Sequence, residues 1–161
     1  MNIGIIVYSK TGNTLLVAER IRVLLAQTGL QSEIRRFTAE AEEARPNATI
    51  KLTDSPDPNP FDALILGAPV QAFSLDPAMS LYLRQIGSIK KMPTLCFITQ
   101  HFKQPWLGGN RAMRQILALL KARGLVAVPL GVVNWTYKQR DQQIEQIAEQ
   151  CVKTLKKELF N

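Results

Sequence analysis

The sequence predicts an α/β protein built on a doubly wound, five-stranded parallel sheet. Short apolar runs that suit buried strands alternate with stretches in which apolar residues recur at helical spacing. Right-handed crossovers between parallel strands leave few arrangements for such a chain. Its length of 161 residues, with 46% hydrophobic and 20% charged residues, indicates a single domain over residues 1–161.

The first predicted strand, residues 3–8, leads through a polar loop into a helix that begins at Leu15. The first N–H groups of a helix lack intrahelical partners, and the helix dipole favours negative charge there. Hydroxyls, a glycine that permits close approach and an asparagine that tolerates a left-handed turn therefore predict a phosphate-binding loop. These residues are Ser9, Lys10, Thr11, Gly12, Asn13 and Thr14. The alternative is an ordinary strand-to-helix connection with Thr11 or Asn13 as its N-cap.

The next segments are an amphipathic helix that ends at Thr28-Gly29 and a strand over residues 31–37. Arg35-Arg36 makes that strand a candidate for the sheet edge. Residues 38–60 change composition, with clustered glutamates and four prolines. We expect a short helical turn near Ala39 to Ala44 and a surface loop over the rest, including the proline-rich segment 45–60.

A nearly continuous apolar run over residues 61–67 predicts a central strand that is buried on both faces. Asp76-Pro77 then caps a helix, and residues 93–99 form another buried strand. A helix over residues 112–121 ends at Gly124. Pro129 and Gly131 make the last strand, residues 125–133, interrupted or an edge. The final helix runs from about Asp141, its expected N-cap, to about Leu159.

Two of the loops resemble the flavodoxin family. Residues 9–14 match its flavin mononucleotide (FMN) phosphate loop, Ser/Thr-x-Thr-Gly-Asn-Thr, with Ala18 at the small helix position that follows. Residues 67–70 match a Gly-x-Pro-Val sequence that borders the isoalloxazine ring, and the loop after residue 99 resembles the third flavin loop by position. Val7, where an aromatic residue is usual, and the cation Lys10 depart from the family pattern.

The resemblance implies the strand order 2-1-3-4-5, with the three loops meeting beyond the carboxyl ends of the strands. It implies FMN as the cofactor and makes two further groups of residues candidates for binding it. They are Ala68, Pro69, Val70 and Phe73 in the second loop, and Thr99, Gln100, His101, Phe102, Trp106 and Gly108 in the third.

Flavodoxins carry electrons between redox partners, which makes electron transfer the first functional hypothesis. The alternative is a flavoenzyme of the NAD(P)H-dependent FMN reductase or quinone reductase type. The ring loops hold His101 and Lys103 but no Asp or Glu. A cation near the ring would stabilise the reduced anion, so we hypothesise a less reducing flavin than in a low-potential flavodoxin.

The net charge of +7 favours acidic redox partner proteins. The cations are spread along the chain without the aromatic interleaving of a nucleic-acid platform, so no nucleic-acid partner is expected. No apolar run approaches the length of a membrane span, and the chain begins with a strand pattern, which favours a cytoplasmic protein. Cys96 and Cys151 indicate buried thiols, and neither forms a metal-binding pattern with His101.

Other classes with similar topology lack their key residues here. A response-regulator receiver needs carboxylates at the end of the first strand, where Tyr8 and Ser9 stand. A low-molecular-weight phosphatase needs a cysteine in the phosphate loop, and a dinucleotide-binding fold needs GxGxxG after the first strand. Neither pattern is present.

Overall fold

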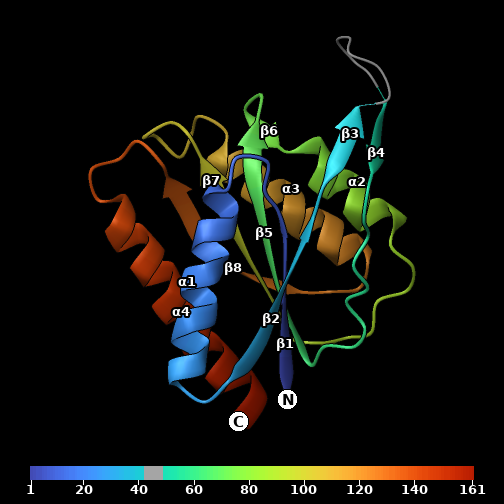
Figure 1. Ribbon diagram of the computed structural model, residues 1–161, viewed down its shortest axis with the longest axis vertical. Coiled ribbons are helices and arrows are strands. Elements are labelled where there is room, and N and C mark those ends of the chain that lie inside the picture. The colour runs from blue at the N-terminus through green and yellow to red at the C-terminus, as the bar shows by residue number, and fades with distance from the viewer. Residues whose placement is uncertain (42–48) are drawn as a thin grey trace.

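A computed structural model describes residues 1–41 and 49–161 and arranges them as a parallel sheet between two layers of helices (Figure 1). The main sheet has the strand order β2-β1-β5-β7-β8, in which every neighbouring pair is parallel. Its strands are β2 (Gln31–Phe37), β1 (Asn2–Tyr8), β5 (Ala63–Gln71), β7 (Thr94–Gln100) and β8 (Ala127–Asn134). This is the predicted order 2-1-3-4-5, and it puts β2 at one edge, as expected.

The helices divide evenly between the faces of the sheet (Figure 1). On one face, α1 (Asn13–Gln27) and α4 (Arg140–Phe160) pack on β1, β5 and β7 through a core that includes Ile5, Ile21 and Cys151. On the other face, α2 (Pro77–Gln85) and α3 (Gly109–Ala122) enclose a second core around Phe37, Tyr82 and Ile116. Both faces of the central strands are thus buried, which explains why those strands are apolar throughout.

The fit between strands and core side chains is close. A Cβ atom added at Gly67 in β5 would lie 2.2 Å from Cζ of Phe97, a fully buried ring in β7. No real Cβ contact is that short, so the ring fills the space that the glycine leaves. Gly67 is therefore required by packing and not by a turn.

Two stretches differ from the prediction. Ala39–Ala41 forms a strand, β3, which pairs antiparallel with β4 (Ile50–Leu52). The expected helical turn is therefore wrong for residues 39–41, and the expected surface loop is wrong for residues 50–52. Residues 42–48, which include the rest of that turn and the start of the 45–60 segment, lie outside the described residues. The small sheet forms because Ile50 packs on the core beside α2 while Lys51 faces solvent.

The helix ends mostly follow the sequence signals. Asp76 caps α2 by accepting a hydrogen bond from the N–H of Ala78 (2.8 Å), as predicted. The N-cap of α4 is Gln139, and Asp141 lies inside the first turn, so the predicted cap is wrong by two residues. None of the helices in the described part of the chain combines the length and apolarity that crossing a bilayer requires.

The last strand is the second edge of the sheet and is irregular, as predicted. Its register with β7 shifts where Cys96 pairs with Pro129 and Phe97 pairs with Gly131. Gly131 has a φ of 141°, a conformation that an L side chain rarely adopts. Leu130 is the extra residue of a β-bulge at this point. Bulges and edge strands are where a sheet tolerates proline, which has no N–H to donate.

Candidate functional site

The loop between β1 and α1 has the geometry of an anion cradle. Gly12 is the N-cap of α1, with a left-handed backbone (φ 99°), and nothing lies within 4 Å of where its Cβ would be. The N-caps that the ordinary-connection alternative named, Thr11 and Asn13, are not used. In residues 1–41 and 49–161, the N–H groups of Asn13 and Thr14 have no protein acceptor. They are free to bind an anion.

The loop is held in shape from inside by Ser9. Its buried Oγ accepts hydrogen bonds from the N–H groups of Gly12 and Leu15, both at 3.2 Å. The guanidinium of Arg36 in β2 donates two hydrogen bonds to the Ser9 carbonyl, one of them at 2.9 Å. The β1–β2 register places Arg36 beside Val7 and so brings its side chain to the loop. Arg36 fixes the loop while adding positive charge beside it.

A second contact joins this loop to the far side of the site. Thr14 Oγ1 at the start of α1 lies 2.8 Å from Thr99 Oγ1 near the end of β7, and both residues are buried. In a pair of hydroxyls one proton is donated within the pair, and the other remains free for a ligand. The pair therefore links the two loops and still offers a donor.

The three predicted loops line one cavity of about 310 Å³ at the carboxyl ends of β1, β5 and β7. Its position is the switch point at which the chain passes to opposite sides of β1. The lining residues are Ser9, Lys10, Thr11, Asn13, Thr14, Pro69, Val70, Gln71, Asp76, Thr99, Gln100 and His101. Most of the residues predicted from the three loops are thus brought together.

The cavity also holds a carboxylate. The ring loops indeed contain no Asp or Glu, but Asp76, just beyond the second loop, is 6% exposed and lines the cavity. Burial raises its pKa, while the hydrogen bond from Ala78 and the charge of Lys10 act in the opposite direction. Burial and the negative charge of Asp76 raise the pKa of Tyr8 at the end of β1, whereas the positive charge of Arg36 lowers it. The site thus pairs an anion cradle with a buried acid.

Gln100 has an internal role that its sequence position does not reveal. Its Nε2 lies within hydrogen-bonding distance of the Phe102 and Gln104 carbonyls (3.1 and 2.6 Å) and of Asn134 Oδ1 (2.5 Å). Its Oε1 accepts from the N–H of Gly109 at 2.8 Å. This amide therefore ties the loop after β7 to the start of α3 and to the end of β8.

The aromatic candidates do not line the cavity, although Phe73 and Phe102 closely follow the lining residues Gln71 and His101 along the chain. Phe73 and Phe102, both exposed, stack with ring centroids 5.9 Å apart and planes at 4°. Gly108, the left-handed N-cap of α3, lies so near Phe73 that a Cβ there would be 2.8 Å from the Phe73 Cα. Trp106 is exposed on the same loop. Ala68, by contrast, is fully buried in the core and does not line the cavity.

Solved structures of similar shape identify the fold. A flavodoxin from the domain Archaea superposes with a TM-score of 0.70 at 13% identity, and the match covers 98% of each chain. Flavodoxin 2 from Bacillus cereus gives 0.65 at 16% identity over 98% of this chain and 99% of that one. The chain has the flavodoxin fold. No protein-family model matches the sequence, and a search of curated proteins returns no relative.

The flavodoxin fold also occurs as part of larger proteins. Rubredoxin oxygen:oxidoreductase from Desulfovibrio gigas matches with a TM-score of 0.64 at 14% identity. The match covers 99% of this chain but only 37% of that one. Identities this low establish the fold and leave the ligand to be argued from the residues of the site.

Sequence reasoning missed three residues of the site on this flavodoxin fold: Arg36, Gln71 and Asp76. Arg36 was interpreted as an edge charge and Asp76 as a helix cap only. A predicted register of β1 and β2 would have revealed the role of Arg36, because their seven-residue pairing places Arg36 opposite Val7, two residues before Ser9. The place of Asp76 in the cavity depends on the turn between β5 and β6 (Ser74–Leu75), and no pattern of apolar residues predicts that turn.

Proposed function

We propose that the protein binds FMN in the cavity at the carboxyl ends of β1, β5 and β7 and carries electrons between redox partners. The observation that carries this proposal is the convergence of three loops on one cavity. The phosphate-type loop contributes hydroxyls and N–H groups that have no acceptor in residues 1–41 and 49–161, while the other two loops carry exposed aromatic rings. Solved flavodoxins of the same fold support the choice of ligand.

The donor set fits a phosphate monoester. Lys10, Thr11, Asn13 and Thr14 line the cavity, and they carry an ammonium group, two hydroxyls and the N–H groups at the start of α1. All of them donate, and two or more charge-assisted bonds to one dianion are typical of phosphate sites. Arg36 holds the loop from behind through the Ser9 carbonyl.

The pair of exposed rings fits a flat ligand ring that remains partly accessible. Phe73 and Phe102 are parallel but only 5.9 Å apart, less than the roughly 7 Å that an aromatic ring needs to stack on both sides. Insertion between them therefore requires the two loops to separate slightly, whereas stacking on one outer face does not. Bound FMN supplies one-electron or hydride chemistry, and the protein sets its exposure and the charge around it.

An absorption spectrum after loading and gel filtration tests the proposal. The purified chain, mixed with excess FMN and freed of unbound flavin, should retain flavin bands stoichiometric with the chain. Thr11→Ala and Thr14→Ala should each weaken retention, because each removes a phosphate donor. Ser88→Ala, an exposed hydroxyl away from the cavity, is the matched control and should bind like the wild type. Full retention by both threonine variants would contradict the phosphate assignment.

Reaction with NADPH separates carrier from reductase. A carrier should keep its flavin oxidised when NADPH is added without a partner protein. If NADPH alone bleaches the bound flavin, the carrier hypothesis is wrong and the NAD(P)H-dependent reductase alternative is favoured.

A further inference from the structure

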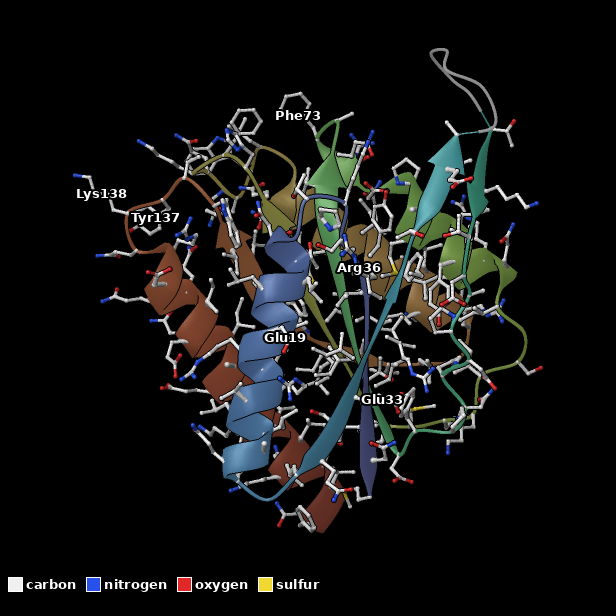
Figure 2. All side chains as sticks on the ribbon, in the orientation of Figure 1. Glu19, Glu33, Arg36, Phe73, Tyr137 and Lys138 are labelled. Carbon is white, nitrogen blue, oxygen red and sulfur yellow. The ribbon has the colours of Figure 1, made fainter. Side chains whose placement is uncertain are left out.

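The end of the molecule at which the parallel strands have their carboxyl ends presents exposed aromatic rings and cations. Phe73 is 54% exposed, Phe102 43%, Trp106 73% and Tyr137 38%. With the exposed Lys103 and Lys138 they form what we call the aromatic–basic face. Figure 2 shows Phe73, Tyr137 and Lys138 projecting from this end, while Glu33 lies toward the other. Large apolar side chains gathered in the open mark interaction sites more often than chance exposure does.

The face is built as one unit from three loops. Phe73 and Phe102 stack across two of them. The loop after β8 joins through Thr136, whose N–H and Oγ1 both donate to the His101 carbonyl at 3.2 and 2.9 Å. The N–H of Trp135 donates to the Gln100 carbonyl at 2.8 Å. These bonds hold the backbone of the loops together, so docking need not order the loops themselves.

The chain holds Phe73 in the open despite a backbone cost. Val70 pairs with Leu75 and Gln71 with Ser74, so Ala72 and Phe73 form a two-residue hairpin turn. Both have positive φ, 48° and 60°, where Asn and Gly are the usual residues. A strained turn that displays a phenyl ring to solvent indicates that the ring has a use at the surface.

Most residues of the face come from a stretch of the chain that contains no carboxylate. Between Asp76 and Asp141 the sequence contains no Asp or Glu, and its cations there include Lys103, Arg111 and Lys138. Both cations of the face, Lys103 and Lys138, are exposed and lie within this acid-free stretch.

We propose that the aromatic–basic face is the docking surface for an acidic electron-transfer protein. The inference rests on the proposed function, because two of the loops that carry the face also line the cavity assigned to FMN. A partner with carboxylates around an apolar centre would pair them with Lys103 and Lys138 while the aromatic rings exclude water. Single-stranded nucleic acid also favours rings and cations, so its binding is included below as a competing outcome of the test.

Salt-dependent kinetics test the charge of the face on the FMN-loaded protein. The rate at which the reduced protein is oxidised is measured with ferricyanide, an anion, and with tris(phenanthroline)cobalt(III), a cation. Each series raises the ionic strength from about 0.01 to 0.15 M, over which the Debye length falls from roughly 30 to 8 Å. Ferricyanide reduction should slow several-fold while cobalt reduction speeds up. Lys103→Gln/Lys138→Gln should flatten both dependences. The control Lys153→Gln/Lys156→Gln, on exposed positions of α4, should keep them.

A titration monitored by nuclear magnetic resonance tests docking without relying on flavin. An acidic ferredoxin added at low salt should shift amide signals around residues 73, 102–106 and 136–138 in the wild type and the control variant. The Lys103→Gln/Lys138→Gln variant should bind several-fold more weakly.

Three results would overturn the inference: equal salt dependence for both oxidants, shifts elsewhere on the molecule, or tighter binding of oligo(dT) than of the ferredoxin at the same salt. Loss of FMN retention with these shifts intact would instead overturn the proposed function alone.

Discussion

Replacing Gln100 with leucine should destabilise the fold strongly, although leucine has a similar volume. The change leaves the buried N–H of Gly109 and the buried Oδ1 of Asn134 without partners. Each unsatisfied buried group costs about 1–3 kcal/mol, so the two together predict a loss of about 2–6 kcal/mol. The Phe102 and Gln104 carbonyls can reach water at the loop surface and add little. Since small domains have a stability of about 5–15 kcal/mol, the loss is readily measured.

Urea unfolding followed by circular dichroism is the assay. Gln71→Leu is the matched control, because Gln71 also lines the cavity but is exposed and donates to no protein acceptor in the described residues. It should unfold near the wild-type midpoint. A loss below about 1 kcal/mol in Gln100→Leu would refute the assigned network. If that variant does not fold, Asn134→Ala, which removes one of the acceptors, gives a milder version of the test.

Three further predictions concern packing, charge and thiol reactivity. Gly67→Ala should cost about 1–3 kcal/mol in urea unfolding, because its Cβ would collide with the Phe97 ring; an unchanged midpoint would show that the ring can move. Asp76→Asn should bind FMN several-fold more tightly at pH 7, and fluorescence titrations should show this advantage shrinking as falling pH protonates Asp76. The pKa of Asp76 is raised in the folded state, so the protonated carboxyl stabilises the fold at low pH. This stabilisation is lost as the pH rises from the unfolded pKa through the folded pKa. Over that pH range the wild type should therefore lose more stability than Asp76→Asn. Burial raises the pKa of Cys96 and Cys151 to about 12, so Ellman's reagent should modify them only after unfolding.

The main sheet and its helices could be predicted because their signals are strong and local. Buried strands such as β7 consist mainly of apolar residues. The Asp76-Pro77 pair begins α2 where expected, and Gly29 and Gly124 follow the ends of α1 and α3 where expected. The meeting of the loops followed from parallel strands alone, since their carboxyl ends must share one edge.

The rest could not be predicted, because it depends on contacts between distant segments. The β3–β4 sheet has only Ile50 and Leu52 as partly buried apolar anchors on β4, and its pairing adds no periodic signal to either short strand. Gln100 had the position of a ligand contact, yet its amide is used to hold neighbouring loops. The pattern of residue types indicated where a ligand could lie but not which polar side chains the protein needs for itself.

The two open edges of the main sheet affect how the protein behaves in concentrated solution. Unpaired edge strands can recruit strands from other molecules and start aggregation. On one edge β2 carries Glu33, Arg35 and Arg36, and on the other β8 carries Pro129 and the bulge before Gly131. Charges, a missing N–H and a bent strand each hinder pairing with another chain. Folded molecules should therefore resist fibril growth when crowded, so that aggregation would begin from unfolded chains.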